Sequence, residues 1–176
     1  YHPDKENLNK AQRLAIELYS HFLGFINNHK IEALKPDYEH APILQLYGGG
    51  AMILLKDFPV PTLICMDQAK ANKISGFSAL PHEFGHDISG TFKGVALVNE
   101  LTAKIANLKI PHSEFWQLWT EECFADAIGM MIIGEAETIS LANLFANFDT
   151  NIIFPDEKEP RPDEHPNRHL RVLLTI

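Results

Sequence analysis

The hydrophobic pattern is clearest at the start of the chain, where apolar residues recur every three or four positions between residues 4 and 29. This spacing places them on one face of a helix that can pack against a core. Asp4 is a suitable N-cap, because its carboxylate can accept hydrogen bonds from the first turn. We predict a long amphipathic helix whose apolar face carries Leu8, Ala11, Leu14, Ala15, Leu18, Phe22 and Phe25.

Short apolar runs follow a polar connector at residues 30–42. Residues 43–47 and 51–55 are separated by three glycines at 48–50, and two such runs joined by glycines predict a β-hairpin. Residues 62–66 are rich in residues that favour strands and predict another strand. The free edge of that strand could pair with an extended peptide through main-chain hydrogen bonds.

The rest of the chain is mainly helical in pattern. Ser78 is a plausible N-cap for a helix that Gly90 ends, and Ser113 is a plausible cap for a later one. Residues 148–166 combine prolines with acidic residues and predict an exposed loop. The predicted helices span residues 78–89, 93–107, 114–133, 135–147 and 166–176. This order indicates the α+β class, mostly helical, with a small mixed or antiparallel sheet beside the helix at 78–89.

Length and composition narrow the possibilities. A chain of 176 residues, 45% of them hydrophobic, can fill one core. We expect a single domain over residues 1–176, in which two lobes could flank a cleft at residues 78–90 and 114–133. The net charge of −8 argues against nucleic acid or an anionic membrane as the main partner. We expect no signal peptide and no membrane span in this region, and the composition indicates neither a compartment nor an oligomeric state.

The strongest chemical motif is H-E-x-x-H, formed by His82, Glu83 and His86. Positions four apart on a helix differ by about 40° around the axis, so both imidazoles can bind one metal ion. Glu83 can then reach a water on that ion and act as general base. The competing interpretation is a helix with two surface histidines. We favour the metal site, because Phe84 and Gly85 are uncharged where a solvated face more often carries Lys, Glu or Gln.

A catalytic zinc ion commonly has three protein ligands and a water, so the motif needs a third ligand. Glu122 is the best candidate, and Asp126 lies four residues later on the same face of the predicted helix. Glu122 would bind the metal, while Asp126 would accept a hydrogen bond from the free ring N–H of a ligand histidine. Two carboxylates on an otherwise apolar helix are costly unless a metal or a proton donor pairs with them.

Four other side chains compete for the third position. Glu121 is rotated by about 100° from Glu122 and is expected to face solvent. Glu100 lies on the intervening helix with no Asp four residues later, and His112 lies in a connector. Cys65 stands in an apolar strand, which favours a core position. With only two cysteines in the chain, we expect buried thiols rather than a disulfide framework.

The H-E-x-x-H motif, followed by E-x-x-A-D at residues 122–126, resembles the gluzincin branch of the zincin metallopeptidases. The resemblance covers roughly residues 60–130 and is closest to the HELGH…ExEAD pattern of the heat-shock and prenyl-protein-processing zincins. Asp87 departs from the extended zincin signature, which prefers an uncharged residue there. The resemblance implies a zincin-like catalytic domain with one Zn²⁺ ion bound by His82, His86 and Glu122, with Glu83 as general base and Asp126 as partner of a ligand histidine.

The tail of the chain carries further candidates. His165 and Pro166, followed by Arg171, resemble a segment found after the ligand helix in the prenyl-processing type. His165, and with weaker support Arg171 or His169, could stabilise the oxyanion that forms when a carbonyl is attacked. The competing interpretation is a polar loop and helix cap on the surface.

These patterns together predict a zinc-dependent metallopeptidase that acts on a peptide or protein substrate. They favour an endopeptidase over an exopeptidase. A metal-activated water would attack the peptide bond, with Glu83 as base. One alternative is a catalytically inactive zincin-fold domain that binds a protein partner. Another is a structural metal site closed by a fourth protein ligand, either His112 or His165.

Overall fold

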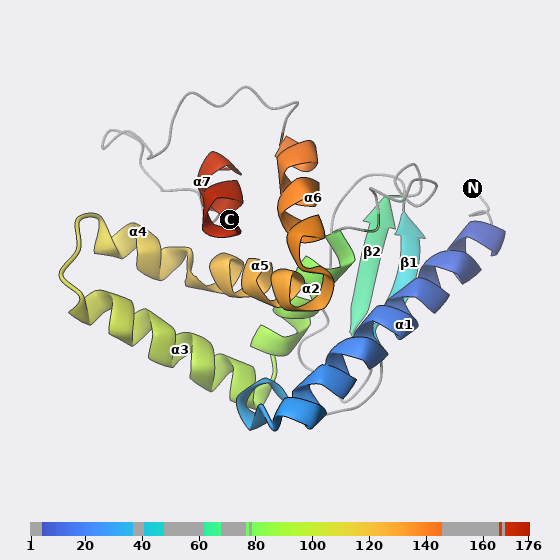
Figure 1. Ribbon diagram of the computed structural model, residues 1–176, viewed down its shortest axis with the longest axis horizontal. Coiled ribbons are helices and arrows are strands. Elements are labelled where there is room, and N and C mark those ends of the chain that lie inside the picture. The colour runs from blue at the N-terminus through green and yellow to red at the C-terminus, as the bar shows by residue number, and fades with distance from the viewer. Residues whose placement is uncertain are drawn as a thin grey trace.

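The computed structural model describes residues 5–36, 41–47, 62–67, 77, 79–145, 166 and 168–176. They form a mostly helical α+β structure with a small sheet, so the expected fold class is confirmed (Figure 1). The elements, in chain order, are α1 (Lys5–His29), the single-turn helix η1 (Glu32–Leu34), β1 (Ile43–Tyr47), β2 (Leu63–Asp67), α2 (Ala79–Ser89), α3 (Phe92–Asn107), α4 (Ser113–Leu118), α5 (Thr120–Ile133), α6 (Glu135–Phe145) and α7 (Arg168–Leu174).

Helix α1 matches the predicted amphipathic helix and lies along the sheet on the side of β1 (Figure 1). Phe25 was expected on the apolar face but is partly exposed and packs on His29. Gln12 joins the helix to the strand: its Oε1 accepts a hydrogen bond from Leu44 N at 2.7 Å, and its Nε2 donates to Pro42 O at 3.0 Å. The buried face consists of Ala11, Ala15, Tyr19, Phe22 and Ile26.

The two described strands are parallel, where the sequence pattern predicted a mixed or antiparallel sheet. β1 and β2 pair in parallel, with Ile43 opposite Leu63 and Tyr47 opposite Asp67. Strand β1 therefore pairs with a strand that begins about twenty residues later in the chain. Two parallel strands need such a long crossover connection, whereas an antiparallel pair can be joined by a short turn. The predicted hairpin partner at 51–55 lies outside the described residues. The strand predicted at 62–66 is confirmed with a shift of one residue.

Helix α2 lies at the centre of the fold and is buried over most of its length. It is confirmed within one residue of its predicted bounds and ends before Gly90, while the predicted cap Ser78 lies outside the described residues. One apolar cluster joins it to the sheet and α1 through Leu80 and Phe84. A second cluster joins it to α1 and α5 through Ile88. Helix α2 is thus held from two sides before any metal is considered.

Helices α2 and α5 approach each other very closely at Gly85. A Cβ at this position would clash with the Cα of Ala125 and lie 2.8 Å from its carbonyl oxygen. Only a residue without a side chain permits this backbone contact, which brings the faces of the two helices together. In Figure 1, α2 passes against α5 near the middle of the ribbon.

The predicted helix at 114–133 is in fact two helices, α4 and α5, separated at Trp119. The Trp119 side chain is fully buried and stacks on Phe115, so packing of this ring accompanies the change in helix direction. The prediction that Ser113 caps α4 is wrong. His112 occupies the cap position, in a left-handed conformation and without a side-chain cap hydrogen bond.

The remaining predicted helices at 93–107, 135–147 and 166–176 correspond to α3, α6 and α7, while residues 146–147 and 167 lie outside the described residues. The loop predicted at 148–166 lies almost wholly outside the described residues. Cys65 is buried in β2 and Cys123 is half-buried in α5, and both are free thiols. No described helix combines the length and apolar composition that crossing a bilayer requires.

Candidate metal centre

Three side chains from α2 and α5 converge where the two helices cross. His82 Nε2 and His86 Nε2 are 3.1 Å apart. Glu122 Oε1 lies 3.2 Å from His86 Nε2, and Glu122 Oε2 lies 3.6 Å from His82 Nε2. These three residues form a group that could hold a metal ion. The predicted pairing of the H-E-x-x-H helix with Glu122 is therefore present in the structure.

The spacing of these donor atoms suits a tetrahedral ion. With metal–ligand bonds of about 2.0–2.1 Å, neighbouring donors of a tetrahedron lie about 3.3 Å apart. The two Nε2 atoms are 3.1 Å apart, close to that value, and each faces a different oxygen of Glu122: His86 Nε2 lies 3.2 Å from Oε1 and His82 Nε2 lies 3.6 Å from Oε2. The three side chains are thus close enough together to hold one ion. Two imidazole nitrogens and one carboxylate are a donor set that several divalent transition metals accept.

Asp126 orients His82 as expected. Its Oδ1 lies 2.9 Å from His82 Nδ1, which leaves Nε2 directed at the metal group. Arg171 of α7 clamps the same carboxylate, since Nε donates to Oδ2 at 2.9 Å and Nη2 donates to Oδ1 at 2.7 Å. Burial alone would raise the pKa of Asp126, but hydrogen bonds from Arg171 and His82 outweigh it and lower the pKa. Asp126 is therefore an ionised acceptor that faces His82 Nδ1.

Glu122 is also held in its ionised form. Burial opposes this, but the hydrogen bond from His86 and the nearby positive charges lower the pKa of Glu122 overall. Arg171 contributes through its Nη1, 3.3 Å from Glu122 Oε2. Burial lowers the pKa of His86, yet the facing carboxylates of Glu121 and Glu122 raise it to about 9. A metal ion would replace this proton, because a ligand imidazole must be neutral.

Glu83 lies beside the group but makes a different set of contacts. The residue is 6% exposed, and among the described side chains its Oε2 has no hydrogen-bond partner. Burial raises the pKa of Glu83, while the charges of His82 and His86 partly counteract this. A buried carboxylate oxygen without a protein partner is unusual and costly, so it marks a place where a water or a substrate group is expected to bind.

Glu121 corrects the sequence-based expectation. Its side chain is 44% exposed, yet it is directed toward α2 and not simply toward solvent. Glu121 Oε1 lies 3.6 Å from His86 Nδ1 and accepts a hydrogen bond from Ser89 Oγ at 2.8 Å. Glu121 is rotated away from Glu122, as helical geometry predicts. The sequence did not predict that α2 would cross the face of α5 that carries Glu121. No local pattern in the sequence marks this contact.

Arg171 and Glu137 complete the polar layer behind His82. Arg171 is buried, which excludes a surface helix cap for this residue. Glu137 of α6 is also buried, and its side chain occupies the space over Gly129, where a Cβ would lie 2.7 Å from Glu137 Cδ. His82, Asp126 and Glu137 form a second group with metal-like spacing. Because Asp126 is already bonded to Arg171 and His82, we assign this group to the support of the first site.

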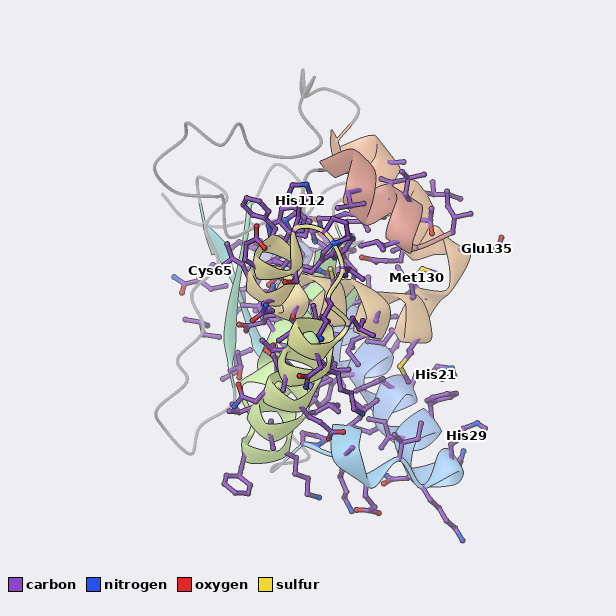
Figure 2. The ribbon with its side chains drawn as sticks, turned by 90° about the vertical axis from the view of Figure 1, so that its left-hand side faces the viewer. His21, His29, Cys65, His112, Met130 and Glu135 are labelled. Carbon is purple, nitrogen blue, oxygen red and sulfur yellow. The ribbon has the colours of Figure 1, made fainter. Side chains whose placement is uncertain are left out.

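The other candidates lie elsewhere or outside the described residues. Glu100 is exposed and pairs with Lys104 at 2.7 Å. His112 is exposed in the connector before α4, and Cys65 belongs to the core, so neither joins the metal group (Figure 2). Figure 2 also shows His21 and His29 projecting outward from α1. The position of His165 and the side chain of His169 lie outside the described residues.

Asp87, the departure from the zincin signature, has a structural explanation. It is buried and accepts hydrogen bonds from Thr62 Oγ1 and, at 3.4 Å, from Tyr19 OH. These partners lie just before β2 and on α1, so the carboxylate ties the metal-site helix to both. The charge is thus satisfied inside the core rather than placed in the metal group.

Comparison with known proteins identifies no relative. No protein-family model, no curated protein and no solved structure matches this chain. The functional argument therefore depends on the geometry of the side chains described above.

Proposed function

We propose that this protein is a zinc-dependent metallopeptidase, an endopeptidase of the gluzincin type, with His82, His86 and Glu122 as ligands. The observation that carries the proposal is the convergence of His82, His86 and Glu122, whose facing donor atoms are 3.1–3.6 Å apart, beside the buried carboxylate of Glu83. Glu83 Oε2 has no hydrogen-bond partner among the described residues. Imidazole donors favour zinc and its transition-metal neighbours over Mg²⁺ or Ca²⁺, which prefer oxygen ligands.

The number of ligands supports a catalytic rather than a structural site. Structural zinc sites are usually closed by four protein side chains, whereas catalytic sites have three and keep one position open. Among the described residues, the group contains only His82, His86 and Glu122. Exposed His112 is not part of it. The alternative of a structural site closed by His112 is therefore disfavoured.

Each residue then has a chemical task. A bound Zn²⁺ ion supplies a water of lowered pKa and polarises the substrate carbonyl. Glu83 accepts the proton of the attacking water and delivers it to the nitrogen of the leaving amine. Asp126 accepts from His82 Nδ1 and so favours the tautomer that leaves Nε2 for the site, while Arg171 holds the Asp126 carboxylate in place. His165 stays a predicted stabiliser of the oxyanion.

A peptide substrate fits the position of β2. The strand packs against α2 through Ile64 and Met66, which share a cluster with Leu80 and Phe84. In Figure 1, β2 lies between β1 and α2, so the strand edge away from β1 is on the side of the metal helix. An extended peptide could pair with such an edge beside the catalytic water. This arrangement favours an endopeptidase, which binds the chain on both sides of the cleaved bond.

Substitution of Glu83 tests the proposal most directly. We expect Glu83→Gln to retain one zinc per chain and to lose hydrolysis of unfolded casein by a factor of about 10²–10⁴, because it removes the base and leaves the ligands intact. Zinc is measured by mass spectrometry of the purified protein. Glu122→Ala serves as the contrasting variant and should lose both zinc and activity.

Two results would contradict the proposal in different ways. A fully active Glu83→Gln protein would remove the general base from the mechanism. A wild-type protein that binds zinc but cleaves neither casein nor a library of short peptides would favour the binding module. Casein and the peptide library together separate endopeptidase from exopeptidase activity.

A further inference from the structure

The two ligand histidines of the proposed metal centre have different neighbours at Nδ1. A neutral imidazole that binds a metal through Nε2 carries its proton on Nδ1, so the ring needs an acceptor there. For His82 that acceptor is Asp126, at 2.9 Å. For His86 the facing acceptor is Glu121 Oε1, at 3.6 Å. Glu121 thus occupies the same position relative to His86 as Asp126 does relative to His82.

Glu121 is itself held in place. Ser89, the last residue of α2, lies one turn after His86. Its hydroxyl donates to Glu121 Oε1 at 2.8 Å and shares that proton with the carbonyl oxygen of His86 at 2.9 Å. Glu121 lies in the first turn of α5, where the helix dipole favours a negative charge. The hydroxyl and the helix end together favour a carboxylate directed at α2.

We infer that Glu121 is a positioning residue for the metal ligand His86, with Ser89 holding the Glu121 carboxylate. The inference rests on the proposed metal centre and extends it to a second oriented histidine. At 3.6 Å the Glu121–His86 contact is longer than a direct hydrogen bond. Glu121 is also half-exposed, so it stabilises the ligand less than buried Asp126 does.

Metal affinity is the measurement that isolates this role. Zn²⁺ is titrated into the metal-free full chain in competition with a chromophoric chelator. We expect Glu121→Ala to weaken zinc binding about tenfold, the lower end of the range for partners of ligand histidines. Absorption of the Co²⁺-loaded protein should shift as well, because the ligand field of His86 changes. Neither readout requires catalytic activity.

A matched control separates positioning from loss of charge. Glu135 is exposed in the first turn of α6 and projects from the edge of the molecule (Figure 2). Glu135→Ala removes the same charge from the same kind of helix position, and we expect zinc affinity and the cobalt spectrum to be unchanged. Glu121→Gln keeps an oxygen that can accept from the ring N–H, so it should recover most of the affinity.

Substitution of Ser89 tests whether this residue acts on the metal centre through Glu121. Ser89→Ala should weaken zinc binding by less than Glu121→Ala, and it should cause no further loss when Glu121 is already Ala. This non-additivity is expected only if Ser89 acts through Glu121. Independent, additive losses would overturn that part of the inference.

The outcomes distinguish this inference from the proposed function. If wild-type protein binds zinc and Glu121→Ala matches it in affinity and cobalt spectrum, the positioning role is overturned. The same conclusion follows if Glu121→Gln binds as weakly as Glu121→Ala. If wild-type protein binds no zinc, the metal centre itself is wrong and the proposed function fails with it.

Discussion

The two sides of the candidate metal centre use the same kinds of group in different surroundings. On one side, His82 faces Asp126, which is 2% exposed and doubly hydrogen-bonded to Arg171. On the other, His86 faces Glu121, which is 44% exposed and bonded to a serine hydroxyl. Water can take the place of Glu121 beside His86, but it cannot reach the buried position of Asp126 beside His82. Burial therefore makes one support strong and hard to remove, and leaves the other weak and dispensable for folding.

This difference also shows how the C-terminal helix contributes. Arg171 is the only described residue of α7 that bonds to Asp126 and Glu122, and α7 packs on α6 and α5. The buried side of the centre thus depends on a helix far away in the sequence. Among the contacts of the described residues, the half-exposed side is formed by α2 and α5, which already carry the centre.

The largest loss of stability is expected when the ion pair on the buried side of the centre is removed. Arg171→Ala leaves the Asp126 carboxylate buried and without its ion pair, which costs about 3–5 kcal/mol of unfolding free energy. Urea denaturation of the metal-free protein measures this loss. Glu121→Ala, the equivalent change on the half-exposed side, should cost less than about 1 kcal/mol. Equal losses for the two variants would refute the contrast between the two sides.

A smaller loss of stability should follow from a substitution that pushes apart α2 and α5, the two helices that carry the centre. Gly85→Ala places a methyl group against the backbone of Ala125, and such overpacking costs about 1–3 kcal/mol. It should weaken zinc binding as well, because it moves α2 relative to Glu122. Gly24→Ala is the control, since a Cβ there meets no atom within 4 Å inside α1. That change should stabilise the protein by about 0.5–1 kcal/mol.

The third effect concerns Glu137, the buried acid behind His82, and appears only as a pH dependence. Burial raises the pKa of Glu137 from 4.5 to about 8, with a further contribution from the Asp126 charge. Because the folded protein holds this proton more tightly than the unfolded chain, stability falls as pH rises above 4.5 and levels off above about 8. Glu137→Gln should remove this part of the slope.

Denaturation of the metal-free protein at pH 5, 7 and 9 gives the comparison between wild type and Glu137→Gln. The difference in unfolding free energy between the two should change in favour of the Gln variant as pH rises. A difference that is constant across the three pH values would show that Glu137 is ionised in the folded protein.

Local features were predictable because they depend on the chain over one or two helical turns. The bounds of α1 and α2, and the alignment of His82 with His86, follow from helical periodicity. Strand direction and the interruption at Trp119 were not predictable in this way. The first depends on which distant segment pairs with β1, and the second on a ring that packs against its neighbours.

By itself, the sequence determined the H-E-x-x-H face of α2, and it indicated the E-x-x-A-D face of α5 with Asp126 one turn beyond Glu122. These relations are set by 3.6 residues per turn, so they hold wherever the helices lie. Only the tertiary structure decided which groups support the centre from outside: Arg171, Glu137 and Glu121. Their positions depend on how α5, α6 and α7 pack against α2, and this packing is a property of whole apolar faces that no short motif records.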